Sequence, residues 1–303
     1  MIALAALALL SPATDLSRVF AANESRNYTV HSRLQTETRG MGVRTWMPAS
    51  HSFEYGFTWR VASLLPDGVA QVRYQRPHMI VVEERFGADE PERRVEKMDL
   101  DFELRLSSSN EILQSKDLGA GKKAGWIGAS GVGAQPQVAS FIGELYRLAA
   151  FAGSLDNALD LLPKLPFESV VPGETWRRTV GYQPQRLASG RSAVQRLDYV
   201  YEYVGIVESN ANKVHRIRAT MKLDTDAAEW VNQWVEGGVK ATGLTKLPLH
   251  LEAVIEADLD LATRATLRAN ATSTGHVAVH TSDATEPAVE VKLKGRSSLA
   301  PTK

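Results

Sequence analysis

From about residue 27 onward, apolar and polar residues alternate with a period of two, which is the pattern of β-strands that bury one face and expose the other. In residues 53–65 most odd positions are apolar, and in residues 98–106 the even positions are apolar while the odd ones are mainly charged. The same alternation returns at 249–259, 267–271 and 289–293. These segments predict long strands with one dry face and one wet face.

The strands are expected to pair antiparallel, because a parallel sheet is covered on both sides and its strands read as continuous apolar runs. Several of the predicted strands exceed ten residues. Strands of that length favour a strongly curved sheet or a partial barrel, since a wide flat sheet would twist away from whatever covers it. The sequence therefore predicts a large curved antiparallel β-sheet or partial barrel.

The centre of the chain breaks this pattern. A glycine-rich connector spans residues 119–133, and apolar residues then recur at helical spacing until Gly153. Ser154 is a good N-cap for a second short helix, which Pro163 would end. We therefore expect a helical hairpin at 137–163 that covers one face of the sheet, and an α+β fold class.

The first residues resemble an export signal. Residues 2–10 form an unbroken apolar run that is too short to span a bilayer, which takes roughly 20 apolar residues, and Ser11-Pro12-Ala13 follows it. The expected organisation is a signal peptide at 1–13, an N-terminal linker at 14–26, a single β-rich domain at 27–299 and a tail at 300–303. The expected location is periplasmic or extracellular.

Composition removes several classes of function. Lys plus Arg (35) equals Asp plus Glu (35), and no basic run is present, which argues against a nucleic-acid partner. The chain contains no Cys, so disulfides, thiolate nucleophiles, Cys-ligated zinc and iron–sulfur clusters are excluded.

Candidate catalytic and metal-binding residues do not form a recognisable arrangement. His276 and His280 would share one face of a strand, but roughly 13 Å apart, too far to hold one ion. Glu256, Asp258 and Asp260 alternate with apolar residues, as charges on a solvated strand face do. We expect neither catalytic residues nor a metal or other cofactor.

Aromatic residues are the strongest candidates for a ligand-binding site in this chain. Phe53, Tyr55, Phe57 and Trp59 share one face of a predicted strand, and Trp230 and Trp234 lie one helical turn apart. On the concave side of a curved sheet they could line a pocket for an acyl chain, with Phe141 and Leu145 of the helical hairpin above them. The alternative is that these side chains form only the core on which the hairpin packs.

One segment resembles a family. Residues 162–167 read Leu-Pro-Lys-Leu-Pro-Phe, residues 170–176 read Val-Val-Pro-Gly-Glu-Thr-Trp, and a Tyr-rich strand follows at 199–203. This arrangement is similar to the centre of uncharacterised bacterial exported β-rich families, which bring no activity with them. In architecture alone, the expected fold also resembles periplasmic lipoprotein carriers, in which a curved sheet holds acyl chains.

The function predicted from these observations is an exported envelope protein that binds a lipid or another hydrophobic ligand under a helical lid. The first alternative is a non-enzymatic structural or protein-interaction protein of the cell envelope. The second is a hydrolase whose catalytic residues converge from distant strands.

Overall fold

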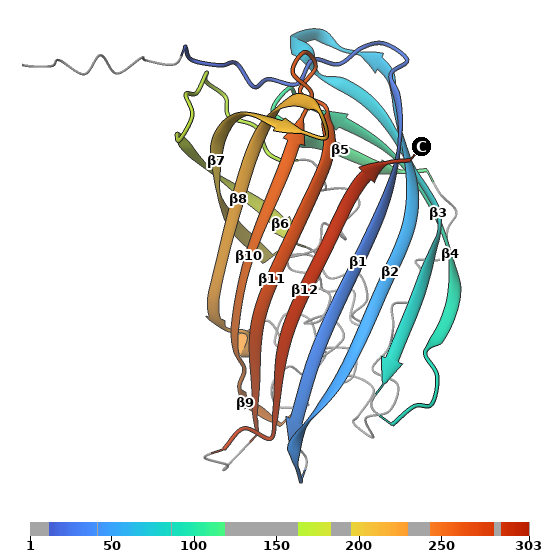
Figure 1. The fold of residues 1–303 in the computed structure, drawn as a ribbon, viewed down its shortest axis with the longest axis vertical. Helices are drawn as coiled ribbons and strands as arrows, with labels where there is room; N and C mark the ends of the chain where they lie inside the picture. The colour runs from blue at the N-terminus through green and yellow to red at the C-terminus, as the bar shows by residue number, and fades with distance from the viewer. Residues whose placement is uncertain are drawn as a thin grey trace, which may run out of the picture.

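The computed structural model describes residues 12–40, 42–85, 87–118, 163–182, 195–229, 243–281 and 286–302. They form one antiparallel sheet with the strand order β5-β4-β3-β2-β1-β12-β11-β10-β8-β7-β6, and β9 pairs separately with β11 (Figure 1). The strands are β1 (Ser25–Gly40), β2 (Val43–Leu64), β3 (Ala70–Arg85), β4 (Glu92–Leu106), β5 (Ile112–Asp117), β6 (Thr175–Tyr182), β7 (Gln195–Ser209), β8 (Asn212–Asp226), β9 (Leu244–Lys246), β10 (Pro248–Leu259), β11 (Thr266–Thr281) and β12 (Val289–Pro301).

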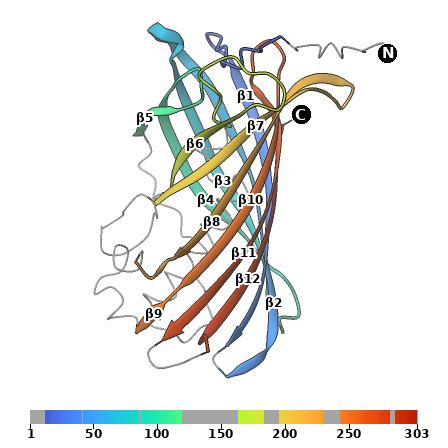
Figure 2. The ribbon, with the colours of Figure 1, turned by 90° about the vertical axis from the view of Figure 1, so that its left-hand side faces the viewer.

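The first and last long strands meet in the middle of the sheet. β1 pairs with β2 on one side and with β12 on the other, with Val30 opposite both Tyr55 and Leu299. Successive strands otherwise follow one another as antiparallel neighbours, so most contacts come from adjacent strands. The sheet curls around one side, and its two edge strands, β5 and β6, turn toward that same side (Figure 2).

The predicted separation of odd and even positions is confirmed in the long strands. On β2, Phe53, Tyr55, Phe57 and Trp59 are all 6% exposed or less, whereas Glu54 between them is exposed. Because the side-chain period of a strand is two, the register places every such apolar set on the same face. We call this the inner face of the sheet, and the opposite one the outer face.

The expected α+β class is wrong. The described residues are almost entirely strand and turn, with helical backbone only in the 3-10 turn Pro66–Gly68 and at residues 228 and 229. The helical hairpin expected at 137–163 falls almost wholly outside the described residues, and no described helix covers the sheet. Apolar residues at helical spacing in 137–163 led us to expect a second layer of helices, but the described architecture is one open antiparallel sheet. Within the described residues, no helix is long and apolar enough to cross a membrane.

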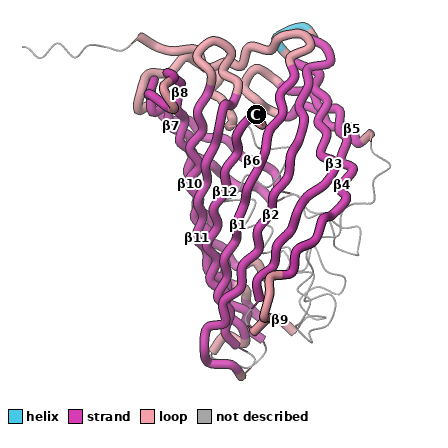
Figure 3. The backbone as a smooth tube through the Cα atoms, turned by 45° about the vertical axis from the view of Figure 1, so that its right-hand side comes forward, coloured by secondary structure: helices cyan, strands magenta, loops and turns pink. Residues whose placement is uncertain are grey.

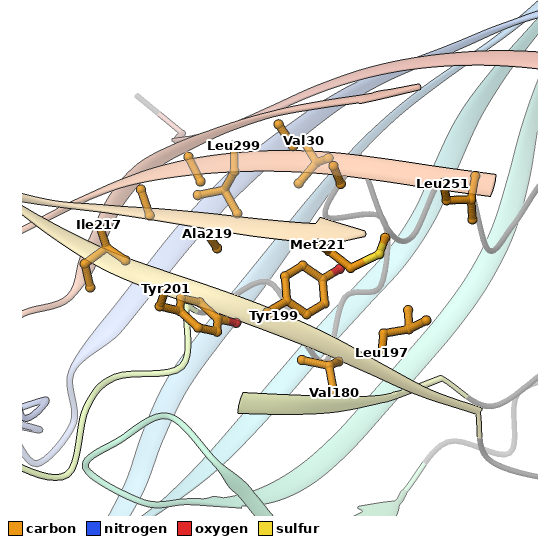
Figure 4. Packing of buried hydrophobic residues seen from close by; sticks show 14 of the residues in the cluster. Val30, Val180, Leu197, Tyr199, Tyr201, Ile217, Ala219, Met221, Leu251 and Leu299 are labelled. Atoms are coloured by element: carbon orange, nitrogen blue, oxygen red, sulfur yellow. The ribbon is translucent and has the colours of Figure 1, made fainter. Parts of the chain in front are cut away.

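The inner face forms one hydrophobic cluster that runs across the whole sheet. Figure 4 shows Tyr199 and Tyr201 of β7 on the same side of the sheet as Val30 of β1, Leu251 of β10 and Leu299 of β12. Large side chains of this kind each contribute about 1.5–3 kcal/mol to folding when fully buried. The inner face is therefore the principal source of stability of this fold.

A clasp formed by residues 163–172 joins the two edges of the sheet at the upper end as drawn in Figure 1. Its Leu165 N–H donates to Ser109 O (2.9 Å) in the turn between β4 and β5. On the other side, the indole Nε1 of Trp176 on β6 donates to Lys164 O (2.8 Å). The clasp therefore closes the sheet into a partial barrel at this end, where loops gather (Figure 3).

The segment before β1 reinforces the same end. Thr14 forms an isolated antiparallel bridge with Val170 of the clasp, and Val19 N donates to Thr263 O (3.0 Å) in the turn between β10 and β11. Leu16 is 0% exposed and Phe20 is 9% exposed, and both belong to the core cluster. Leu16 and Phe20, which lie within the expected N-terminal linker at 14–26, thus pack on the inner face. The expected signal peptide lies outside the described residues except for Pro12 and Ala13.

Candidate functional site

The aromatic residues predicted from β2 are brought together on the inner face. Phe57 stacks against Tyr28 of β1 with 5.2 Å between ring centroids, and it lies 5.2 Å from Tyr74 of β3 on its other side. Tyr55 lies 6.4 Å from Phe57. This spacing suits offset and tilted aromatic pairs, so the β1–β3 side of the inner face is a continuous aromatic wall.

Trp59 continues this wall toward the clasp. Its ring stacks on Phe20 with 6.0 Å between centroids, and the Arg18 guanidinium lies 5.7 Å from the Trp59 ring. The indole Nε1 of Trp59 is buried without a hydrogen-bond partner. A buried indole N–H usually finds an acceptor, so Trp59 leaves an unsatisfied donor on the inner face.

A second aromatic wall lies on β7 and was not among the predicted site residues. Tyr201 stacks on Trp176 of β6 with 5.6 Å between centroids and an interplanar angle of 11°, and Tyr199 lies 6.1 Å from Tyr201. The signal was present in the sequence as alternating tyrosines at 199–203, but only the register of the sheet places this wall across from the one on β2.

Between the two walls, the inner face of β10, β11, β12 and β1 carries small side chains. These small residues form two neighbouring rows that run across the strands. One row contains Ala253, Ser273 and Gly295, and the other contains Ala271, Ser297 and Ser32. Gly275 continues the small stretch on β11; a Cβ there would lie 2.3 Å from Leu251 Cδ2 and 3.0 Å from His250 O, so leucine side chains lie across the glycine. The hydroxyl of Ser273 is buried without a hydrogen-bond partner.

Polar groups interrupt the inner face mainly at two places. On β3 and β4, Glu83 is 1% exposed and forms an ion pair with Arg94 (2.7 Å), and the Arg76 guanidinium lies 4.3 Å from the Tyr55 ring. Near the clasp, the Tyr203 hydroxyl and His215 Nδ1 are 2.8 Å apart. The arrangement is an apolar surface with a few fixed polar groups at its margins, which is typical of sites for hydrophobic ligands.

The burial of these polar groups shifts their proton affinity. Burial raises the pKa of the Tyr28 hydroxyl to about 12, against the opposing effects of Arg26 and Arg18. Burial also lowers the pKa of His215, and the positive charge of Arg264 lowers it further. Tyr28 and His215 are therefore both neutral at neutral pH, and the charges at this end of the inner face are those of Arg18 and its ion-pair partner Glu24.

Four of the predicted ligand-binding residues lie outside the described residues: Phe141, Leu145, Trp230 and Trp234. Phe53, Tyr55, Phe57 and Trp59 are all on the inner face, and their part in binding stays a prediction.

The acidic residues of β10 do not behave as a uniformly solvated face. Asp258 is 2% exposed and accepts hydrogen bonds from Arg216 Nε (2.7 Å) and Ser209 Oγ (2.7 Å), with Arg268 as a third donor. Burial alone would raise the pKa of Asp258, but these donors outweigh it and hold that pKa below its ordinary value. Asp258 therefore has a structural role on the outer face.

Metal-ligating residues do not gather within the described ranges: no group of three or more His, Asp and Glu residues there could hold an ion. His276 and His280 lie on β11, and His276 faces Glu290 (4.0 Å) rather than the second histidine.

Comparison with known proteins gives neither a family nor a relative. No family model matches the chain, and no curated protein matches it. A lipovitellin structure, described as showing lipid–protein interactions in lipovitellin, is 10% identical with a TM-score of 0.41, and the match covers 94% of this chain but 25% of that one. The Pseudomonas aeruginosa protein OccK5 (OpdH) is 8% identical with a TM-score of 0.24, covering 93% of this chain and all of that one. The chain thus spans a quarter of the lipovitellin chain, and the TM-scores lie below the level at which two chains share a fold.

Proposed function

We propose that this protein binds a lipid or another hydrophobic ligand on the inner face of its curved sheet. The observation that carries the proposal is the extent of that face: apolar side chains from β1–β4, β6–β8 and β10–β12 form one cluster on a single layer of strands. Its apolar side chains are buried along the length of the sheet, and among the described residues no second sheet packs against it.

The chemistry of the face supports a ligand that is mostly apolar with a small polar group. Two aromatic walls flank a stretch of small residues, and rings of this kind offer large rigid contact areas to acyl chains. The Trp59 indole and the Ser273 hydroxyl are buried donors without partners in this structure. A carboxyl or ester oxygen of a lipid would satisfy one of them.

Uptake of a fluorescent fatty acid by refolded protein tests the proposal. The protein is unfolded, separated from any bound lipid, refolded and titrated with the probe. Wild-type protein is expected to show saturable uptake at a fixed stoichiometry. Failure of the correctly refolded protein to take up the probe would overturn the proposal.

Two neighbouring residues of β10 provide a matched pair of variants. Ala253 is 3% exposed on the inner face, whereas Val254 is 40% exposed on the outer face. Ala253→Phe places a ring where the ligand would lie and is expected to weaken uptake about tenfold or more. Val254→Phe adds the same ring on the outer face and is expected to leave uptake within about twofold.

We also propose that the protein is exported, to the periplasm or beyond, because residues 2–13 have the composition of a signal peptide. Fractionation of the producing cells tests this directly. Mature protein that starts near residue 14 in the exported fraction is the expected result. Full-length protein confined to the cytoplasm would contradict it.

A further inference from the structure

Two arginines lie side by side on the outer face at the centre of the sheet. Arg33 of β1 and Arg296 of β12 are direct partners in the antiparallel register. Directly opposed residues in such a pair have Cβ atoms about 4.5–5.5 Å apart, and like charges in that position destabilise the sheet. The placement therefore carries an electrostatic cost.

The two arginines line a hollow of about 680 Å³ that is bordered mainly by outward-facing residues. Ser32, Phe53, Ala271 and Ser297, whose side chains lie on the inner face, also border it. Arg93 and His31 line it as well, and the single carboxylate among its lining residues is Glu54, which faces His31 at 3.7 Å. The hydroxyl and amide groups of Ser52, Thr272, Ser298 and Asn270 complete its polar surface.

Charge compensation inside this hollow is incomplete. Arg33 forms an ion pair with Glu84 (3.0 Å), which also accepts a hydrogen bond from Ser50 (2.6 Å). Within the described residues, Arg93 and Arg296 form no ion pair with a carboxylate. Arg33 is therefore held by Glu84, while Arg296 lines the same hollow without an ion-pair partner among the described residues.

A second hollow of about 710 Å³ adjoins the first and shares Arg33 with it. It adds Lys292 and Lys294 on β12, against Glu37 and Glu84. Positive groups therefore continue along β12 from Arg296 through Lys294 to Lys292, every second residue, on the same face.

We propose that the outer-face hollow around Arg33 and Arg296 binds an anion with phosphate- or sulfate-type oxygens, carried either by a soluble molecule or by a lipid headgroup. Two adjacent guanidinium groups offer planar sets of N–H donors that match such oxygens in pairs, and an anion between them converts their repulsion into attraction. This site is on the opposite face from the proposed lipid site and does not depend on it.

Thermal unfolding with inorganic pyrophosphate tests the soluble source, at an ionic strength kept constant with sodium chloride because salt screens exposed charges. Co-flotation with phosphatidylglycerol vesicles, against phosphatidylcholine vesicles, tests the headgroup source. If the site is real, pyrophosphate raises the Tm of wild-type protein by about 2 °C or more, or the anionic vesicles alone carry the protein.

Arg296→Gln and Lys222→Gln form the matched pair, because each removes one positive charge from the outer face. Lys222 is 67% exposed at the side chain, pairs with Glu252 (3.0 Å) and lies outside both hollows. Arg296→Gln should weaken anion binding about tenfold or more while slightly raising the Tm without anion, because it relieves the repulsion from Arg33. Lys222→Gln should leave binding within about twofold.

Arg296→Lys provides a second variant that keeps the charge and loses the planar donors, with intermediate binding expected. Binding of neither probe to wild-type protein would overturn the proposal. An equal loss of binding in Arg296→Gln and Lys222→Gln would overturn it too, because the attraction would then be general rather than local.

Discussion

Leu251 and Val254 lie three residues apart on β10 and face opposite sides of the sheet. Leu251 is 0% exposed and belongs to the core cluster, whereas Val254 is 40% exposed among polar neighbours. The inner and outer faces differ in the same way along the whole sheet. The inner face is joined by aromatic and aliphatic contacts across strands, and the outer face by cross-strand ion pairs such as Arg218–Glu256 (2.9 Å) and Lys222–Glu252 (3.0 Å).

The difference shows what each face contributes. Exposed ion pairs are worth about 0–1 kcal/mol each, because water and salt screen them, so the outer face adds register and solubility more than stability. Buried apolar side chains contribute several times more per residue. Asp258 is the exception on the outer face, since Arg216 and Arg268 cover it from the two neighbouring strands.

Truncation on β10 is expected to give the largest contrast between the faces. Leu251→Ala should lower the free energy of unfolding by about 2–5 kcal/mol, because it removes buried methyl groups and leaves a cavity. Val254→Ala should change it by less than about 0.5 kcal/mol. Urea unfolding of the two variants measures both. Equal effects would mean that the faces are not separated as described.

Removal of the Asp258 carboxylate tests its role as a buried charge on the outer face. Asp258→Asn is expected to lower the free energy of unfolding by about 2–3 kcal/mol at pH 7, because Arg216 and Arg268 lose their charged acceptor. The pKa of Asp258 is lowered in the folded protein, so its contribution is present above about pH 4 and is lost as the pH falls below that value. The difference between variant and wild type should therefore shrink in acid. A difference independent of pH would contradict the assigned role.

Alanine substitutions at two glycines on different strands distinguish the effect of side-chain packing on stability from that of backbone flexibility. Gly275→Ala should cost about 1–2 kcal/mol, because its Cβ would lie 2.3 Å from Leu251 Cδ2. At Gly56 of β2 the nearest atom to a Cβ is Tyr28 O at 3.7 Å, so Gly56→Ala should be neutral or stabilising by less than about 1 kcal/mol. Thermal unfolding of both variants measures the contrast, and a stable Gly275→Ala variant would show that the inner face has spare room there.

The smallest expected effect concerns His215. Its pKa is lowered in the folded protein by burial and by Arg264, so the unfolded chain takes up the proton more readily. Stability contributed by neutral His215 is complete above about pH 6.5 and declines as the pH falls below that value, by about 1 kcal/mol or less. Unfolding curves at pH 8 and pH 5.5 measure the decline, and His215→Gln should reduce it. A decline of the same size in the variant would assign it to other groups.

The sequence predicted the strands and their faces well because a period of two is a local signal. Phe53, Tyr55, Phe57 and Trp59 are buried as their parity requires, and Leu251 and Leu259 likewise. The α+β class was wrong because the helical periodicity of 137–163 was taken as a covering layer, whereas the described structure is one open sheet.

Features that depend on contacts between distant strands could not be predicted in the same way. The second aromatic wall on β7 takes its place only through the order of the sheet, and the clasp depends on hydrogen bonds between residues more than fifty positions apart, such as Leu165 and Ser109. Asp258 occupies a position of β10 that alternation predicts to be exposed. Its burial is explained only by Arg216 and Arg268, which lie opposite it on the neighbouring strands. The outer-face pair of Arg33 and Arg296 likewise requires the register.

The most direct test of the inner face as a ligand site is native mass spectrometry of the protein purified from the cells that naturally produce it. The account predicts a population heavier than the bare chain by the mass of a lipid or similar hydrophobic molecule, which dissociates when the protein is denatured. A single mass that is the same under native and denaturing conditions would contradict it.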